Sequence, residues 1–336
     1  MVLIPTLPGA RMSQRTVLIT GGAGYIGSHC AQTLQAAGIE TVVYDDLSTG
    51  YRAAVDCEFV EGDIRDRDKL TKVLRSRPFD GVLHFAAKLL VGESVTHPLR
   101  YYDTNVAGTT SLLQAMKAAD VGVLVFSSTC AIYGNPDYLP LDEDHPTRPV
   151  SPYGVSKLMV EQILDACRER EDFKITSLRY FNAAGADPTG KLGESHDPET
   201  HLIPLALNAA KRGDSLRVFG RDYPTPDGTC VRDYIHVSDL AEAHRAAIET
   251  MWAGAPGRAY NCGTGKGASV LEVLDAVERV TGLPLKRIDA SRRDGDPAGL
   301  YAKADRLRAD LNWTPKYEEI DAIVETAWQW AQAPRY

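Results

Sequence analysis

Residues 16–27 read TVLITGGAGYIG, and this stretch decides the fold of the chain. Its first five residues are apolar or β-branched and predict a buried strand, residues 21–27 form a glycine-rich turn, and the apolar residues through Leu34 predict a helix. Glycines in such a turn let backbone N–H groups approach a phosphate at the N-terminus of the helix. We therefore predict a dinucleotide-binding turn, against the alternative of a tight turn without a ligand. The candidate contacts are Gly21, Gly24, Tyr25, Ile26 and Gly27.

A second strand, predicted over residues 40–44, ends at the acidic residue Asp45. An acid at this place can accept hydrogen bonds from the adenosine ribose and repels a phosphate, which favours NAD over NADP. Further apolar strands at 58–63, 82–87 and 123–128 alternate with helical stretches that include 67–76 and 105–119. This order predicts an α/β fold of the Rossmann type, a doubly wound parallel sheet with ligands at the carboxyl ends of its strands and a smaller α/β substrate lobe.

Three of these strand ends carry further candidate contacts, although each one taken alone is more often a plain strand terminus. Asp63 can accept from the adenine amino group. The small segment at 85–87 lets a cofactor approach the backbone, and the segment at 127–129 brings hydroxyl groups to the nicotinamide. The residues concerned are Phe85, Ala86, Ala87, Ser127 and Thr129.

Tyr153 and Lys157 are four positions apart in the run SPYGVSK and would share one face of a helix. Ser151 as the N-cap and Pro152 at the first helical position would open that helix. A lysine cation beside a tyrosine stabilises the phenolate and lowers its pKa, as does the positive end of the helix dipole. The pair therefore predicts a proton-transfer site, whereas the alternative is an ordinary solvated helix face.

Composition predicts a soluble enzyme of two lobes or one large α/β domain, since the chain has 336 residues, of which 44% are hydrophobic. There is no apolar run of membrane-spanning length and no signal-peptide pattern, and a net charge of −8 argues against a nucleic acid partner. The six cysteines are dispersed without metal-like spacing, so we expect reduced thiols in the cytoplasm and no metal. Residues 1–13 fit no element and are expected to be a disordered or non-native extension.

The chain closely resembles the UDP-glucose 4-epimerases, which belong to the extended short-chain dehydrogenases/reductases. The resemblance runs from about residue 16 to 331, and its motifs are TGGAGYIGSH at 20–29, VGES at 91–94, SPYG at 151–154, LRYFN at 178–182, DYPT at 222–225 with GT at 228–229, and VRDYIHV at 231–237. It implies interconversion of UDP-galactose and UDP-glucose with an NAD that stays bound. It also implies an NAD-binding domain over 14–182, a mainly UDP-sugar-binding lobe over 183–336 with segments returning to the first domain, and a homodimer built by helices around 105–119 and 154–170.

The same resemblance assigns roles to individual residues. Tyr153 is the base for the sugar 4-hydroxyl, Lys157 tunes it and binds the nicotinamide ribose, and Thr129 hydrogen-bonds the sugar oxygen. Further cofactor contacts implied are Asp46, Ile64, Asn105 and Tyr180. The implied substrate contacts, besides Thr129 and Tyr153, are Phe181, Asn182, His201, Leu202, Val218, Phe219, Arg232, Tyr234, Arg293, Asp296 and Leu300.

Departures from the family pattern bear on the substrate. Sugar-nucleotide 4,6-dehydratases carry an Asp-Glu pair directly after the threonine, whereas this chain has Cys130 and Ala131. A lysine common in the family is shifted by one position to Lys88, and His201 stands where an asparagine is usual. Leu300 replaces the tyrosine of narrow-specificity members, which predicts that UDP-GlcNAc is also accepted.

Two alternatives remain open. A UDP-xylose/UDP-arabinose 4-epimerase would use the same machinery on a sugar that lacks the C6 hydroxymethyl group. A non-catalytic NAD-sensing protein could share the fold, but such sensors generally lose the tyrosine–lysine pair that this chain retains.

Overall fold

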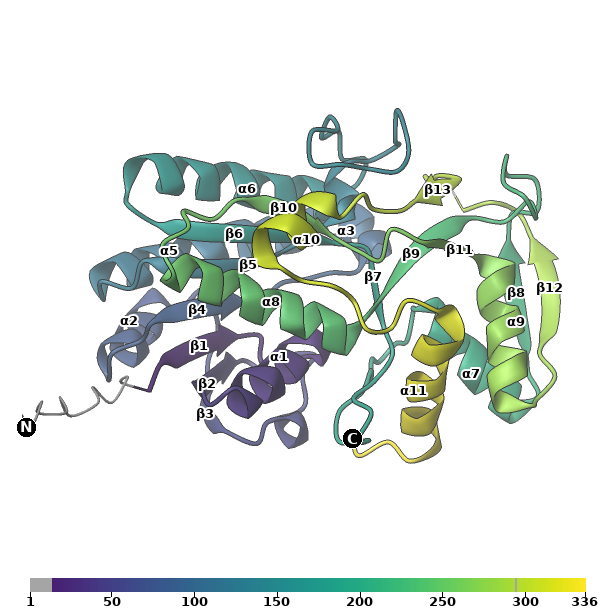
Figure 1. The fold of residues 1–336 in the computed structure, drawn as a ribbon, viewed down its shortest axis with the longest axis horizontal. Helices are drawn as coiled ribbons and strands as arrows, with labels where there is room; N and C mark the ends of the chain where they lie inside the picture. Colours follow the sequence, from purple (N-terminus) through teal and green to yellow (C-terminus); the bar gives the residue numbers. More distant parts are fainter. Residues whose placement is uncertain (1–13, 294) are drawn as a thin grey trace, which may run out of the picture.

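The computed structural model describes residues 14–293 and 295–336, so the expectation for residues 1–13 lies outside the described residues. A seven-stranded sheet with the order β10-β6-β5-β4-β1-β2-β3 forms the larger part of the molecule, and all of its strand pairs are parallel (Figure 1). Its strands are β1 (Thr16–Thr20), β2 (Glu40–Asp45), β3 (Glu58–Glu61), β4 (Gly81–His84), β5 (Val123–Thr129), β6 (Lys174–Tyr180) and β10 (Ala259–Cys262). The predicted doubly wound parallel sheet is confirmed.

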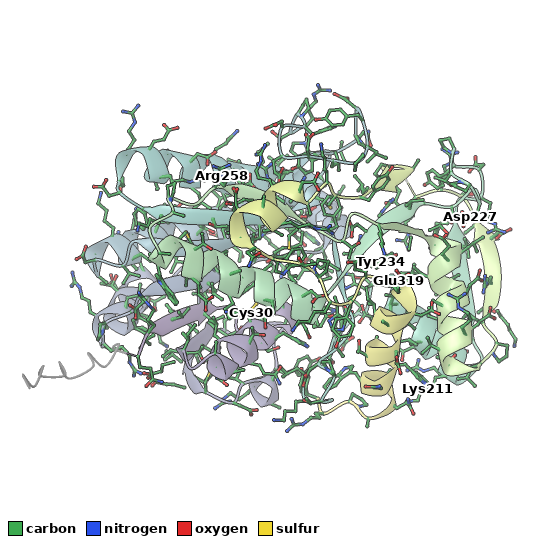
Figure 2. The ribbon with its side chains drawn as sticks, viewed as in Figure 1. Cys30, Lys211, Asp227, Tyr234, Arg258 and Glu319 are labelled. Atoms are coloured by element: carbon green, nitrogen blue, oxygen red, sulfur yellow. The ribbon has the colours of Figure 1, made fainter. Side chains whose placement is uncertain are left out.

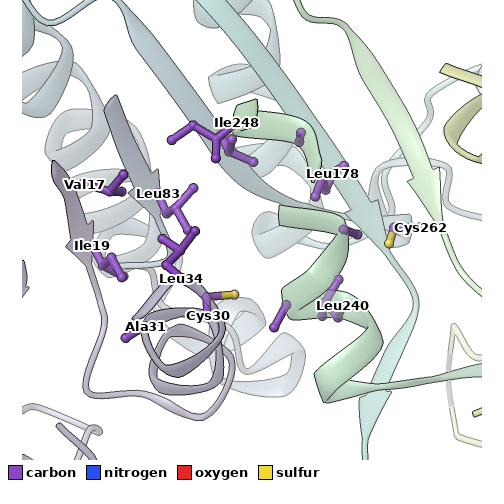
Figure 3. Packing of buried hydrophobic residues seen from close by; sticks show 14 of the residues in the cluster. Val17, Ile19, Cys30, Ala31, Leu34, Leu83, Leu178, Leu240, Ile248 and Cys262 are labelled. Atoms are coloured by element: carbon purple, nitrogen blue, oxygen red, sulfur yellow. The ribbon is translucent and has the colours of Figure 1, made fainter. Parts of the chain in front are cut away.

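Helices cover both faces of this sheet because alternate strand residues point to opposite sides. Ile19, Leu83 and Leu178 pack on α1 (Tyr25–Ala36) and α8 (Val237–Trp252), through side chains such as Cys30 and Leu240 (Figure 3). The opposite face packs on α2 (Arg67–Arg75), α5 (Gly108–Ala118) and α6 (Pro152–Arg170). The near-continuous apolar strands thus follow from burial on both faces.

The predicted helix at 105–119 is divided in the structure. A π-helical segment, η2 (Tyr102–Ala107), precedes α5 and is itself preceded by the short helices α3 (Val91–Thr96) and α4 (Pro98–Tyr101). Two short 3₁₀ helices, η1 (Arg52–Ala54) and η3 (Cys130–Ile132), follow β2 and β5. Among the described residues, no helix is long and apolar enough to cross a membrane.

A smaller lobe lies beside the carboxyl ends of the large sheet (Figure 1). Its central strand is β9 (Val231–His236), which pairs with β7 (Asn182–Ala184), β11 (Gly267–Ser269) and β13 (Gly299–Leu300). A two-stranded sheet joins β8 (Ser215–Phe219) to β12 (Lys286–Ala290). The core of this lobe is built by α7 (Leu202–Arg212), α9 (Val270–Thr281) and α11 (Ile320–Gln332).

Some segments after residue 182 pack with the large sheet rather than with the smaller lobe. They are α8, β10 and α10 (Asp305–Leu311), and α8 and α10 contribute to the same core as α1. The chain crosses between the two parts at β7 and β9, where Tyr234 lies (Figure 2). The assignment of 14–182 to NAD and of 183–336 to the UDP-sugar stays a prediction.

Candidate functional site

The glycine turn leaves the start of α1 free of obstructing side chains. Gly21 has a φ of +72°, and a Cβ atom added there would lie 2.4 Å from the Ala86 amide nitrogen. A Cβ atom on Gly27 would lie 2.3 Å from the Gly21 carbonyl oxygen, so both positions require glycine. Gly24 meets nothing nearer than 3.4 Å. A phosphate can therefore approach the N-terminus of α1, and the turn fits a dinucleotide pyrophosphate.

Asp45, at the end of β2, is buried and tied to the glycine turn. Its carboxylate accepts hydrogen bonds from the Ala23 N–H (3.0 Å) and the Leu47 N–H (2.8 Å). Burial raises the pKa of Asp45, which these two hydrogen bonds oppose. The side chain is thus held in one orientation at the wall of the site, where it can accept from ribose hydroxyls.

Asp63 differs from the expectation because it already has a partner. Arg65 Nε donates to Asp63 Oδ1 at 3.0 Å, and this contact lowers the pKa of Asp63. Arg65 also pairs with Asp103 on η2. The Asp63 carboxylate can reach an adenine amino group while it keeps its arginine, since a carboxylate has several acceptor sites.

A cavity of about 610 Å³ at the carboxyl ends of the large sheet gathers most of the predicted residues. It is lined by the predicted cofactor residues Gly21, Gly24, Tyr25, Ile26, Gly27, Asp45, Asp46, Asp63, Ile64, Phe85, Ala86, Ala87, Ser127, Lys157 and Tyr180. The predicted substrate residues that line it are Thr129, Tyr153, Phe181, Asn182, His201, Leu202 and Tyr234. Lys88 and Leu89 both line it as well, so the one-residue shift leaves both side chains at the same cavity.

Asn105 is not among the lining residues, because its side chain is used inside the protein. Its Oδ1 accepts from the Lys88 N–H at 2.8 Å, and its Nδ2 donates to the Lys88 carbonyl oxygen and to Ser156 Oγ. Asn105 therefore joins the segment after β4 to α6. This arrangement favours a structural use of the side chain over the predicted contact with the cofactor.

Tyr153, Lys157 and Thr129 converge from α6 and β5. Ser151 is the N-cap of α6, with its Oγ accepting from the Gly154 N–H at 3.2 Å, and Pro152 is the first helical residue, which confirms the predicted helix start. Burial raises the pKa of Tyr153 to about 12, and a hydrogen bond with Thr129 opposes that rise.

Lys157 is placed differently from the expectation. Its Nζ donates to the Ser127 carbonyl oxygen at 2.7 Å and lies 4.7 Å from the centre of the Phe126 ring. Burial lowers the pKa of Lys157 to about 7, and Glu161 opposes this change. Burial has the largest effect on the pKa of both side chains, and the lowering of the Tyr153 pKa by Lys157 stays a prediction.

The remaining predicted substrate residues lie on β8, β9 and β13 and on the loop between β12 and β13, and they do not line the cavity. Arg232 donates to the Pro297 carbonyl oxygen at 3.0 Å and to Asp296 Oδ1 at 3.4 Å. The Arg293 guanidinium lies 4.1 Å above the Phe219 ring. The buried Val218 and Leu300 also lie outside the lining of the cavity. Together with Asn105, these are the predicted site residues that the cavity does not bring together with Tyr153.

A comparison with known protein families matches residues 17–263 to the one described as the NAD dependent epimerase/dehydratase family. The chain belongs to the NAD dependent epimerase/dehydratase family. It is 50% identical over 321 residues to the UDP-glucose 4-epimerase of Rhizobium meliloti (strain 1021), which covers 95% of this chain and 98% of the relative.

Solved structures of this epimerase/dehydratase family agree with the fold. A UDP-glucose 4-epimerase from Brucella ovis in complex with NAD has a TM-score of 0.91 at 46% identity, covering 94% of this chain and 97% of its own. One from Stenotrophomonas maltophila, with bound NAD and formylated UDP-arabinopyranose, has a TM-score of 0.93 at 40% identity and covers 95% and 98%. The resemblance seen in the sequence motifs is confirmed.

Within the epimerase/dehydratase family, the residue after Thr129 bears on the reaction. Burial raises the pKa of the Cys130 thiol to about 12, so the thiol stays neutral near pH 7 and is a poor acid or base there. Cys130 packs with Leu300 in a small apolar cluster that also contains Phe181 and Tyr133. Leu300 thus packs against the cluster that contains Phe181, and Phe181 lines the cavity.

Two groups of residues near the site were not predicted. One is the buried ion pair of Glu161 with Arg179, in which Arg179 Nη2 lies 2.6 Å from Glu161 Oε2. Ser128, which lines the cavity, also donates to Glu161. Glu161 follows Lys157 by one helical turn, which was an available signal.

The other unpredicted group precedes α7 and surrounds His201. Glu194 and His196 line the cavity with His201, and His201 Nδ1 contacts the Glu194 carboxylate. Although burial alone lowers it, Glu194 and Glu199 raise the pKa of His196 to about 9. The repeat of glutamate and histidine, two residues apart, at 194–196 and 199–201 was the signal in the sequence.

Proposed function

We propose that this chain is a UDP-glucose 4-epimerase, which interconverts UDP-galactose and UDP-glucose through a transient 4-keto sugar and keeps its NAD between turnovers. The observation that carries the proposal is the cavity, in which the glycine turn and the Thr129, Tyr153 and Lys157 side chains meet residues of the smaller lobe. The similarity to UDP-glucose 4-epimerases over nearly the whole chain supports it.

Inversion at C4 of the sugar cannot begin with removal of a proton from that carbon. C4 of a hexose is not acidic, so its configuration is erased by oxidation to a ketone and reset by reduction on the opposite face. NAD, when bound, supplies the hydride acceptor and donor. Tyr153 takes the proton of the 4-hydroxyl and returns it, and Thr129 hydrogen-bonds the oxygen as it becomes a carbonyl. Lys157 binds the nicotinamide ribose and stabilises the Tyr153 phenolate.

In this proposal, residues of the smaller lobe bind the UDP part of the substrate. Arg232 and Arg293 neutralise the diphosphate, because a planar guanidinium can make paired hydrogen bonds to phosphate oxygens. Asp296 accepts from the uridine ribose, and Asn182 contacts the sugar. Phe219 lies with Val218 beside the uracil. The pairing of Arg232 with Asp296 brings the two side chains together, which supports a shared role in binding the nucleotide.

We further propose that the enzyme is a cytoplasmic homodimer of galactose metabolism. The apolar side chains of α5 are largely buried against the large sheet, which leaves little of that helix for a partner. Exposed apolar side chains lie instead on α3, α4 and α6, namely Val91, Val95, Leu99 and Met159. We therefore place the contact on these three helices rather than on the predicted 105–119 segment.

The proposal is tested by incubating purified protein with UDP-galactose, without added cofactor, and separating the products by chromatography. We expect UDP-glucose to form, and Tyr153→Phe to lower the rate by about 10²–10⁴ with little change in UDP binding. Tyr138→Phe is the matched control, since Tyr138 is exposed and outside the cavity. Wild-type turnover by the Tyr153 variant would contradict the assigned base.

Retention of the cofactor is tested on the same preparation. After denaturation, we expect NAD rather than NADP in the supernatant, and less of it from Asp45→Ala, because that variant loses the acceptor for the ribose hydroxyls. Turnover by a sample stripped of NAD, without any added, would overturn the redox route.

A pentose substrate is the second candidate, because the Stenotrophomonas structure holds a UDP-arabinopyranose derivative. The same assay with UDP-xylose and UDP-galactose in competition distinguishes the two. A higher kcat/KM for UDP-xylose would make the pentose the preferred substrate.

A further inference from the structure

A cluster of two glutamates and two histidines lies on the loop between β7 and α7. Glu194, His196, Glu199 and His201 each offer one ligand atom, and these atoms all lie within 4.8 Å of one another. The four residues fall within eight positions, and the last of them directly precedes α7. The proposed epimerase mechanism uses His201 at most, so the other three side chains have no role in it.

The cluster is partly enclosed and converges on two carboxylates. Glu194 Oε1 lies 3.2 Å from His196 Nδ1 and also contacts His201 Nδ1, and Glu199 Oε2 lies 3.7 Å from His196 Nδ1. The Glu194 side chain is 6% exposed and that of His196 is 19% exposed. The two imidazole rings are 5.3 Å apart and nearly perpendicular, so their nitrogens approach a shared point from different directions.

One nitrogen in the cluster lacks a hydrogen bond. His196 Nδ1 is buried and, within the described part of the chain, no atom meets it at a hydrogen-bonding angle, despite the two carboxylates nearby. A buried polar atom without a partner is rare in native proteins and calls for an explanation such as an ion. The nitrogen is paired by charge with Glu194 and Glu199, so it supports an ion at this place together with the grouping of the four residues.

The ligand atoms are held by contacts outside the cluster. The other oxygen of Glu199, Oε1, accepts from the Thr200 and His201 N–H groups at 2.7 and 2.8 Å, which leaves Oε2 directed to His196. The Glu194 carbonyl oxygen accepts from Trp330 Nε1 on α11 at 2.9 Å. The Tyr25 ring lies edge-on to His196 at 6.3 Å. The loop is thus fixed on both sides before any ion binds.

We propose that Glu194, His196, Glu199 and His201 form a binding site for one divalent transition metal ion, with Zn²⁺ as the expected occupant. Two imidazole nitrogens and two carboxylate oxygens match the ligand set and the coordination number of structural zinc. Ca²⁺ and Mg²⁺ prefer six or more oxygen ligands, which this cluster does not offer. The two carboxylates balance the charge of the ion, as a partly enclosed site requires.

The distances require a modest contraction of the cluster. Zn²⁺ takes nitrogen and oxygen ligands at about 2.0–2.2 Å, which places tetrahedral ligand atoms about 3.4 Å apart. The longest separations, up to 4.8 Å, therefore close, and the shorter contact of His201 Nδ1 with the Glu194 carboxylate opens, by side-chain rotations of about 1 Å. The earlier expectation of no metal rested on cysteine spacing alone. A bound ion would join the start of α7 to the loop that faces the glycine turn, and so hold one wall of the cavity.

The test uses the full chain, treated with a chelator, desalted and titrated with Zn²⁺ and separately with Co²⁺. We expect one metal ion per chain by elemental analysis, and Co²⁺ to give the intense visible bands of a tetrahedral site without the near-ultraviolet bands of thiolate ligation. His196→Asn and Glu199→Gln should each weaken the affinity by about 100-fold or more, because loss of a direct ligand costs at least as much as loss of an outer-shell partner.

Controls separate the metal site from folding and from chance binding. The Glu199→Gln variant keeps an oxygen for the Thr200 and His201 N–H groups, and circular dichroism verifies that each variant is folded. His97→Ala, which removes an exposed histidine elsewhere on the chain, should leave the affinity unchanged. The proposal would be overturned by any of three results. These are no metal binding by the wild type, equal metal affinity in the wild type and the two cluster variants, or a Co²⁺ spectrum with thiolate bands. None of these readouts depends on epimerase activity.

Discussion

Replacement of Glu161 by glutamine should strongly destabilise the protein, because it removes the charge from a buried ion pair. The side chains of Arg179 and Glu161 are 10% and 5% exposed. Arg179 Nε lies 3.0 Å from Oε1 and 3.1 Å from Oε2 of Glu161, and Arg179 Nη2 lies 2.6 Å from Oε2. Both carboxylate oxygens are therefore engaged by one guanidinium away from water.

The magnitude follows from the burial. Removal of one partner leaves the Arg179 guanidinium without a counter-charge, and such losses cost about 3–5 kcal/mol in the free energy of unfolding. The Tyr133 hydroxyl continues to accept from Arg179 Nη1 at 3.0 Å but supplies no charge. Glu161 also raises the pKa of Lys157, so its loss should make Lys157 less cationic near pH 7 and lower the epimerase rate.

The assay is urea unfolding of the wild type and Glu161→Gln, with Glu169→Gln as the control on the exposed face of the same helix. The control should change the free energy of unfolding by less than about 0.5 kcal/mol. The double variant Glu161→Leu/Arg179→Met should regain most of the stability that Glu161→Gln loses, because no charge is then left buried. A loss below about 1 kcal/mol in Glu161→Gln, or no recovery in the double variant, would refute the reasoning.

Other predictions concern the chemistry, the substrate and the pH. Lys157→Met should shift the ascending limb of the plot of kcat against pH to higher pH, by about 1 pH unit or more, because the Tyr153 phenolate loses its cation. An unchanged position of this limb would count against that role of Lys157. Leu300→Tyr should suppress conversion of UDP-GlcNAc more than that of UDP-galactose, by about 1–3 kcal/mol in competition kinetics, since added bulk beside Phe181 narrows the cavity; equal losses would contradict it. The free energy of unfolding should fall as the pH is lowered from 6.5 toward 4, by at most about 1.4 kcal/mol per pH unit for each buried histidine. The reason is that burial lowers the pKa of these histidines, so the unfolded chain binds more protons than the folded chain in this range. A free energy of unfolding from urea that does not change with pH would contradict this prediction. The histidines are His29 and His244, with pKa values lowered to about 4, and His84 and His236, lowered to about 3.

The sequence by itself determined the elements whose cause is local. The strand at 16–20, the glycine turn and the following helix could be read because their residue types are required by backbone geometry within one short stretch. The start of α6 at Ser151 and Pro152 could be read for the same reason. The alternation of apolar strands with helices was enough for a parallel sheet, and thus for a site at its carboxyl ends.

Only the tertiary structure decided which distant side chains meet and how much water reaches them. The ion pair of Glu161 with Arg179 joins α6 to β6. The chain returns to the large sheet through α8 and β10, so residues beyond 236 pack with that sheet. The contact of Lys157 with the Ser127 carbonyl oxygen joins α6 to β5, and burial raises the pKa of Tyr153. Desolvation depends on every element packed around a group, so no local pattern specifies it. The same holds for the four side chains at 194–201, whose spacing is visible in the sequence but whose convergence depends on the fold.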